Sequence, residues 1–443
     1  MKGNISPEIF REYDIRGDAE RDLTDGVVEA IGRAYGTWLR ERAVSRVSVG
    51  GDVRLSTPRI RSAVVRGLTA SGIDIVDIGT VTTPMLYWSM HHLDLRGAVM
   101  ITGSHNPPNM NGLKLGYDNA TLWGDSIQEV RRLTESDLPT VGPGTVTARD
   151  ITDDYLAMLA SRFEPFSRTF KVVCDSGNGT AGPIAERFFK SLGCACIPLY
   201  AEPDGRFPNH HPDPQKRENL QDLIEKVKAS GADVGFAFDG DADRLVVVDE
   251  NGEIIHGDAL LGILAVYLKG KNRLAGNKMV ATVMSNSALE DFLAKHDIAL
   301  HRCNVGDKFV LETMHELGAN FGGEQSGHVI FGDYAKTGDG IASALQFAAC
   351  MLDMKKKASE FSGMIKPYPQ ILRNLKIADK KPLEKLKGLK ELEVSLKADK
   401  IRSLFRYSGT ENVIRLLIEG KNEKLLQKRM DEVEKFFTKA LNE

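Results

Sequence analysis

VGFAFDGDADR, at residues 234–244, joins an apolar run to three alternating aspartates. The run Val234 to Phe238 is typical of a buried strand, and Asp239, Asp241 and Asp243 follow where that strand ends. Carboxylates so placed offer oxygen ligands, which Mg²⁺ prefers, and no Cys or His that would favour zinc stands beside them. Because Mg²⁺ held by few protein groups usually shares its shell with a phosphate, the stretch indicates phosphoryl transfer.

A solvated loop and a calcium-binding loop are the two other interpretations of this acidic turn. Most acidic clusters are solvated loops, and an EF-hand calcium loop starting at Asp239 would need glycine where Arg244 stands, although Glu250 fits its last position. The β-branched run Leu245 to Val248 predicts a strand and not a ligand-bearing loop. Magnesium is therefore favoured over calcium.

A strand, a helix and a second strand recur in this order three times along the chain. The three units are 47–51, 58–71 and 73–78; 171–174, 182–192 and 194–199; and 279–283, 287–295 and 298–303. Each is typical of a βαβ crossover, which needs a parallel sheet covered by helices. We predict three related α/β domains with mixed or parallel sheets around a central cleft.

A later strand of each unit ends in a polar, glycine-containing loop. These strands and loops are 97–101 into 102–107, 234–238 into the aspartates, and 320–322 into 323–328. Since ligands of open α/β sheets bind at the carboxyl ends of the strands, the three loops are predicted to converge on one cleft.

The last part of the chain has a different pattern. Predicted strands at Glu391 to Leu396, Ile401 to Tyr407 and Val413 to Glu419 are joined by short turns and followed by a helix from Glu423 to Leu441. This pattern indicates an antiparallel α+β domain, with a loop at 406–412 whose guanidinium, hydroxyl and backbone N–H groups suit a phosphate. The predicted domains are 1–150, 151–256, 257–366 and 367–443.

Composition limits the classes of partner. The chain has 443 residues, 42% hydrophobic and 27% charged, with a net charge of -3, so neither nucleic acid nor an anionic membrane is attracted in general. Five scattered cysteines suit a reducing compartment, and no uncharged run approaches the roughly 20 residues that span a bilayer. We expect a cytoplasmic monomer or homodimer that acts on small molecules.

Ser104, between Gly103 and His105, is by itself more typical of a turn or a helix N-cap than of a nucleophile. The ordered segments TGSHNPPNMNGLKL (102–115), DGDADR (239–244), GGEQSGH (322–328) and RYSGTE (406–411) change that weighting. Together they resemble the α-D-phosphohexomutases, the phosphoglucomutase and phosphomannomutase superfamily. The resemblance covers essentially the whole chain.

The resemblance implies a role for each segment. Ser104 matches the serine that carries the phosphoryl group and contacts Mg²⁺, and Asp239, Asp241 and Asp243 match the metal ligands. The residues matching those that bind the sugar and the phosphate not being transferred are Glu324, Ser326, His328, Arg406, Ser408, Gly409, Thr410 and Arg415. Those matching positions near the reacting groups are Arg16, Lys114, Arg244 and His328.

The implied chemistry needs an in-line oxygen, a cation and a group that moves a proton. Lys114 is the leading general acid/base candidate, with His105 or His328 in reserve, but Lys114 suits a fixed positive charge equally well. Phosphoserine would convert a hexose 1-phosphate into a hexose 1,6-bisphosphate, which turns end for end and returns its other phosphate to Ser104. Free hexose 1,6-bisphosphate would also recharge a dephosphorylated enzyme.

Different segments of the chain resemble family branches that act on different sugars. Residues 10–17 and 102–108 look like the phosphomannomutase/phosphoglucomutase branch, whereas 282–286, 305–308, 323–328, 336–340 and 408–412 are similar to phosphoglucosamine mutases. Asp307 could bind the ammonium of an amino sugar, or pair with Lys308 or Arg302. We expect mannose and glucose phosphates first and glucosamine phosphate next. The alternatives from other classes are a Mg²⁺-dependent sugar-phosphate phosphatase and a non-catalytic sugar-phosphate sensor.

Overall fold

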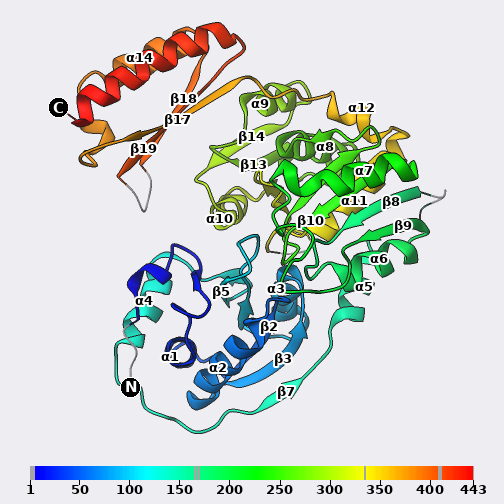
Figure 1. Ribbon diagram of the computed structural model, residues 1–443, viewed down its shortest axis with the longest axis vertical. Helices are drawn as coiled ribbons and strands as arrows, with labels where there is room; N and C mark the ends of the chain where they lie inside the picture. The colour runs from blue at the N-terminus through cyan, green and yellow to red at the C-terminus, as the bar shows by residue number, and fades with distance from the viewer. Residues whose placement is uncertain (1–4, 164–165, 167–169, 334–335, 408–411, 443) are drawn as a thin grey trace.

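Four sheets follow one another along the chain in the computed structural model, which describes residues 5–163, 166, 170–333, 336–407 and 412–442. We call the parts that carry them the first to fourth domains. In Figure 1 the first lies at the bottom, the second and third at the upper right, and the fourth at the upper left. Three mixed α/β domains and one antiparallel domain confirm the predicted fold class.

The first sheet has the order β1-β5-β4-β2-β3-β7, with β6 beside β5. Its strands are β1 (Ile15–Asp18), β2 (Arg46–Gly51), β3 (Asp74–Thr80), β4 (Gly97–Ile101), β5 (Met110–Tyr117), β6 (Ala120–Thr121) and β7 (Val146–Ala148). The helices of this domain are η1 (Pro7–Ile9), α1 (Asp25–Arg40), α2 (Thr57–Ala70), α3 (Thr83–His92) and α4 (Gly124–Thr134). β2, β3 and β4 pair in parallel, whereas β5 pairs antiparallel with β4 and β1.

The second sheet has the order β12-β11-β10-β8-β9. Its elements are α5 (Thr152–Ala160), β8 (Phe170–Asp175), α6 (Gly182–Ser191), β9 (Cys194–Leu199), η2 (Arg217–Leu220), α7 (Gln221–Ser230), β10 (Val234–Phe238), β11 (Leu245–Asp249) and β12 (Ile254–Ile255). β10 is buried at every position because α7 and α11 pack against it. The three aspartates therefore follow directly after the buried central strand of this sheet.

The third sheet has the order β14-β13-β15-β16. Its elements are α8 (Gly257–Gly270), η3 (Ala275–Asn277), β13 (Lys278–Thr282), α9 (Ser287–Ala294), β14 (Ala299–Cys303), α10 (Asp307–Leu317), β15 (Phe321–Gly323), β16 (Val329–Phe331), α11 (Gly340–Met354) and α12 (Ala358–Ser362). One hydrophobic core joins Leu86 of α3, Phe236 of β10 and Phe347 of α11, so the first three domains pack as neighbours. Within the described residues we find no helix with the length and apolar character that a bilayer crossing requires.

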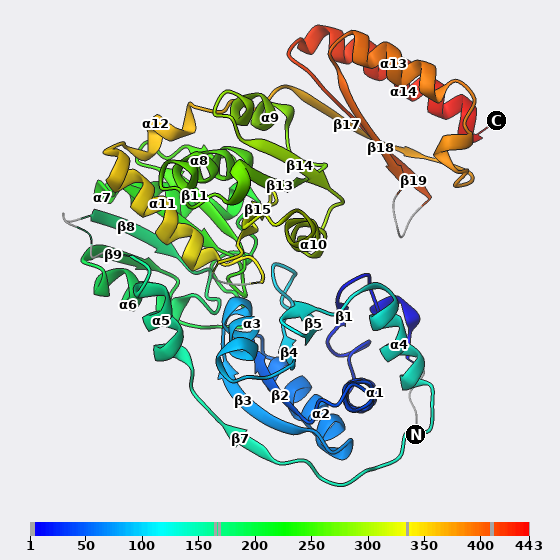
Figure 2. The ribbon, with the colours of Figure 1, turned by 180° about the vertical axis from the view of Figure 1, so that it is seen from behind.

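The fourth sheet has the order β17-β19-β18, and all its pairings are antiparallel. Its elements are β17 (Gln370–Lys376), η4 (Leu383–Lys385), α13 (Leu389–Ala398), β18 (Arg402–Tyr407), β19 (Val413–Glu419) and α14 (Glu423–Asn442). In Figure 2 both helices, α13 and α14, cover one face of this sheet. Arg402 Nη1 donates to the Ser285 carbonyl at 3.0 Å, and Glu419 Oε1 accepts from the Ser287 amide at 2.8 Å. The base of the sheet is thus attached to the start of α9.

One predicted element is wrong. Glu391 to Leu396 lies within α13 and is not a strand. Leu389 and Leu396 are buried on one side of the helix, whereas Val394 is 69% exposed. The apolar residues therefore follow the helical period although their alternation imitates a strand. The missing strand is supplied by β17, which the sequence did not predict.

Candidate active site

Three of the four polar segments meet at one cavity of about 390 Å³. One segment follows β4, one joins β10 to β11, and one joins β15 to β16. The predicted residues that line the cavity are Arg16, Ser104, His105, Lys114, Asp243, Arg244, Glu324 and His328. A larger cavity of about 490 Å³ between the first and second domains is lined by none of the predicted site residues.

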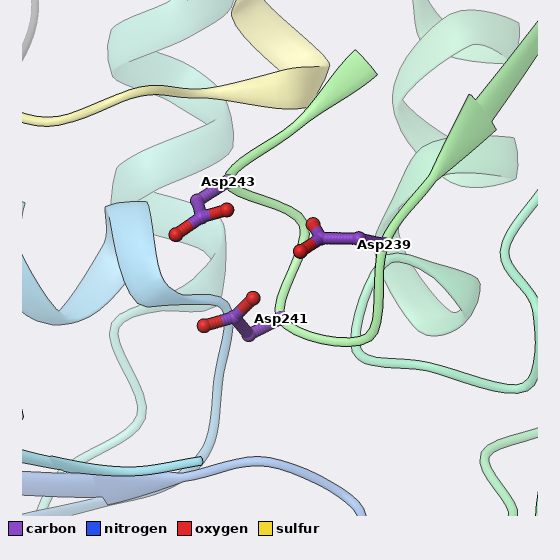
Figure 3. Close-up of side chains that lie close together, drawn as sticks. All are labelled: Asp239, Asp241 and Asp243. Atoms are coloured by element: carbon purple, nitrogen blue, oxygen red, sulfur yellow. The ribbon is translucent and has the colours of Figure 1, made fainter. Parts of the chain in front are cut away.

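Asp239, Asp241 and Asp243 form a buried acidic cluster, and Figure 3 shows their carboxylates pointing toward one another. One oxygen from each lies within 4.8 Å of the others. Burial and repulsion by Asp243 and Asp241 raise the pKa of Asp239 well above its usual range. Asp241 Oδ1 and Asp243 Oδ1 have no hydrogen-bond partner among the described residues. Buried, unsatisfied carboxylate oxygens fit a divalent cation with oxygen ligands.

Ser104 stands at the edge of this cluster. Its Oγ donates to Asp239 Oδ2 at 3.0 Å and lies 3.1 Å from His105 Nδ1. The residue has φ of 49°, in the left-handed region, and its amide donates to Thr102 Oγ1. It follows a strand and begins no helix, so the N-cap interpretation does not apply.

Cationic groups surround the serine and the acidic cluster. Lys114 Nζ lies 2.7 Å from Asp243 Oδ2 and 3.3 Å from Asp241 Oδ2. Burial lowers the pKa of Lys114, but these two carboxylates outweigh it and raise that pKa well above the ordinary value. Burial, with Arg244 and Arg16, lowers the pKa of His105 to about 3. At neutral pH Lys114 is therefore positively charged and the His105 ring is neutral.

The third domain adds Glu324 and His328 to the cavity wall. Glu324 Oε1 accepts from the Gly306 amide at 3.0 Å, and burial raises its pKa. His328 Nε2 lies 3.6 Å from Asp243 Oδ2 and 3.8 Å from Asp307 Oδ2. Burial opposes charge on His328, but Asp243 and then Asp307 raise its pKa above the ordinary value. Ser326 is half-buried and does not line the cavity.

Asp307 lines the cavity, and neither of the pairings considered for it forms. Lys308 binds Glu12, with Nζ and Oε1 2.6 Å apart, and Arg302 binds Glu290 at 3.2 Å. Both pairings of Asp307 with these basic residues are therefore wrong. The Asp307 carboxylate stays at the wall of the cavity, near His328.

Arg406 and Arg415, the described residues of the predicted phosphate-binding set in the fourth domain, do not line this cavity. Arg406 and Arg415 are opposite each other on β18 and β19 and are half-buried. Ser408, Gly409 and Thr410 lie outside the described residues. In Figures 1 and 2 the end of β18 and the start of β19 point toward the side of the molecule where the first domain lies.

Arg54 supports the Ser104 loop, a role that the sequence patterns did not predict. Its side chain is fully buried and pairs with Asp52 at 3.1 Å. Its guanidinium donates to the carbonyls of Ser104, Asn106, Pro107 and Met110. Four carbonyls of the loop therefore bond to one planar group, which a lysine could not replace. Arginine in a loop is usually exposed, so only the tertiary contacts reveal this role.

We expect Arg54→Met to lower the free energy of unfolding by about 3 to 5 kcal/mol, because the buried Asp52 carboxylate loses its cation. The control Arg66→Met removes a half-exposed guanidinium that pairs with Asp25 and Glu29, and should cost no more than about 1 kcal/mol. Urea unfolding of both variants checks this expectation. Equal losses in the two variants would contradict it.

Comparisons with known proteins agree with the arrangement of the domains. Models of the phosphoglucomutase/phosphomannomutase family match residues 7–139 (alpha/beta/alpha domain I), 153–252 (domain II), 256–368 (domain III) and 372–436 (C-terminal domain). A phosphoglucosamine mutase from Campylobacter hominis is 50% identical over 450 residues, covering 98% of this chain and 100% of its own. One from Campylobacter curvus is 48% identical over 456 residues, with the same coverage.

A solved structure extends the likeness to three dimensions. The X-ray structure of a phosphoglucomutase/phosphomannomutase family protein from Burkholderia thailandensis is 32% identical, covers 98% of each chain and has a TM-score of 0.86. The four family matches follow the order of the four sheets, which confirms the resemblance seen in the sequence. The chain belongs to the phosphoglucomutase/phosphomannomutase family and is an intramolecular phosphotransferase of the phosphohexomutase type.

Proposed function

We propose that the protein is a phosphoglucosamine mutase, which interconverts glucosamine 6-phosphate and glucosamine 1-phosphate. The observation that carries this choice is the 50% identity, over the full length, to a protein of that name. It favours glucosamine phosphate over the mannose and glucose phosphates that the sequence motifs placed first. Asp307 supports the same choice, because a carboxylate at the cavity wall can bind an ammonium group.

Ser104 is the proposed carrier of the phosphoryl group. Ser104 lines the cavity, and the left-handed backbone that Arg54 holds places its Oγ within hydrogen-bond distance of Asp239. Asp239, Asp241 and Asp243, with the Ser104 oxygen, would hold Mg²⁺. Bound there, Mg²⁺ would neutralise charge on the phosphoryl oxygens.

The remaining side chains have proposed roles that match their positions. Arg16 and Arg244 place guanidinium groups at the cavity, where they can neutralise phosphate charge. Lys114 carries a positive charge beside the acidic cluster, which favours the role of a fixed charge or proton donor. Glu324 and His328 face the sugar, and Ser326 extends the same loop.

The phosphate that is not transferred needs a second binding site. We assign it to Arg406, Ser408, Gly409, Thr410 and Arg415 of the fourth domain, which must approach the first three domains to reach the same sugar. A glucosamine 1,6-bisphosphate would be the intermediate, turning between the two transfers, and closure would exclude water. Ser104 could then receive either phosphate in turn.

Specificity constants test the proposed sugar. We expect kcat/KM for glucosamine 1-phosphate to exceed the values for mannose and glucose 1-phosphates by at least about tenfold, the worth of one hydrogen bond to a charged group. Asp307→Asn should remove most of this preference. The control Asp297→Asn changes an exposed residue outside the cavity and should leave the preference intact.

Equal constants for the three sugars in the unaltered protein would refute the proposed specificity. Inorganic phosphate released in step with substrate loss would instead support the phosphatase alternative. Isomer formation without phosphate release is the expected outcome.

A further inference from the structure

The side chain of Lys308 lies in an aromatic enclosure between the first and third domains. Only 3% of it is exposed, although it is the second residue of α10. Its Nζ lies 4.0 Å from the ring centre of Trp123, 4.2 Å from that of Phe309 and 5.8 Å from that of Tyr13. Glu12 Oε1, 2.6 Å away, supplies the negative partner. An ammonium group so enclosed is held by the ring faces and by the carboxylate together.

This enclosure is a direct contact between two domains. Glu12, Tyr13 and Trp123 belong to the first domain, whereas Lys308 and Phe309 belong to the third. Trp123 and Phe309 also meet edge to face, with centroids 6.0 Å apart. The Glu12 carbonyl accepts from the amide of Gly124, which starts α4, so the backbone near Glu12 is fixed as well.

Both sides of the contact continue directly into the active-site cavity. Tyr13 is followed by Asp14, which pairs with Arg16 at 2.7 Å, and both residues line the cavity. Lys308 is preceded by Asp307, which lines the opposite wall near His328. A shift at Lys308 would therefore move the sugar-binding wall relative to the wall that carries Ser104.

We propose that Lys308 is a positioning residue that sets the separation of the first and third domains, and thereby the fit of the hexose phosphate. The inference rests on the proposed mutase function. Lys308 acts through Asp307 and Arg16 and does not touch the reacting atoms. Ser104 and the acidic cluster, which belong to the first and second domains, keep their mutual contacts without it.

Steady-state kinetics with glucosamine 1-phosphate test this role. Lys308→Met keeps the apolar stem and removes the charge, and we expect kcat/KM to fall about 10²-fold, the scale of a displacement of about 1 Å. The loss should lie mainly in KM, because the substrate spans both walls. Lys308→Arg should restore most of kcat/KM, since a guanidinium can stack on Trp123 and pair with Glu12.

Lys271→Met is the matched control. Lys271 Nζ also pairs with a carboxylate, that of Asp353 at 2.7 Å, and lies 5.7 Å from the ring centre of Tyr267, but it lines no part of the cavity. Its kcat/KM should stay within about twofold of the unaltered protein. Glu12→Gln should lower kcat/KM by itself and add less than about twofold to Lys308→Met, because the two residues form one contact.

Three results would overturn the inference. They are a loss in Lys308→Met no larger than in the control, a loss confined to kcat, or fully additive effects of Glu12→Gln. Failure of the proposed function is distinguishable, because the unaltered protein would then form no isomer of glucosamine 1-phosphate or would convert the three sugars equally. Calorimetric binding of glucosamine 6-phosphate to Lys308→Met would still test the positioning, with weaker binding expected and unchanged binding contradicting it.

Discussion

Ser104→Ala is expected to lower kcat by at least about 10⁴-fold, the scale seen when a nucleophile is removed. The serine oxygen is the atom that would accept and donate the phosphoryl group, and it lies 3.0 Å from Asp239 within the cavity. Methyl and hydroxymethyl side chains have similar volumes, so glucosamine 6-phosphate should still bind. A coupled assay measures kcat, and calorimetry measures binding.

Ser89→Ala is the matched control for this substitution. Ser89 is also a fully buried serine of the first domain, but its Oγ bonds to Ser48 and to the Leu86 carbonyl and not to the cavity. Its kcat should remain close to that of the unaltered protein. Full activity in Ser104→Ala would refute the phosphoserine mechanism.

Asp241→Asn is expected to lower kcat by at least about 10²-fold, the scale for losing a preorganised charge-stabilising group. Asp241 Oδ2 already accepts from Thr83 Oγ1 at 2.6 Å, so the unpartnered Oδ1 is the oxygen left for a cation. A neutral amide would weaken the cluster's attraction for Mg²⁺. The dependence of the rate on Mg²⁺ concentration should move to higher concentration.

Asp249→Asn controls for the loss of a buried carboxylate in the same domain. Asp249 ends β11, and its Oδ1 accepts from the amides of Asn251 and Glu253, away from the cavity. This variant is expected to lose stability but to keep the same Mg²⁺ dependence. An unchanged rate and Mg²⁺ dependence in Asp241→Asn would show that the acidic cluster is not the metal site.

Sequence patterns predicted the part of the fold that depends on local periodicity and on strand ends. β10 matched its predicted bounds because a run of five apolar residues is typical of a strand that is buried on both faces of its sheet. The rule that ligands gather at strand ends placed Ser104 near Asp239, although they are far apart in the chain. The acidic cluster was predictable because Asp239, Asp241 and Asp243 stand at alternate positions in one turn.

Side chains whose roles come from distant partners could not be predicted in this way. Arg54 looks like an ordinary loop residue until its bonds to Ser104 and Met110 are known. The sequence suggests the adjacent Asp307 as a partner of Lys308, but Lys308 binds Glu12 of the first domain. The alternation of apolar and polar residues around Val394 is compatible with a strand or a helix. Packing against the fourth sheet favours the helix.

Phosphoryl transfer through Ser104 is the central claim, and a single turnover of protein labelled with ³²P at Ser104 tests it most directly. The labelled protein is mixed with glucosamine 6-phosphate, and the products are separated after quenching. The account predicts that the label leaves Ser104 and appears in glucosamine 1,6-bisphosphate and then in glucosamine monophosphate. Label that remained on the protein, or that appeared only as inorganic phosphate, would contradict it.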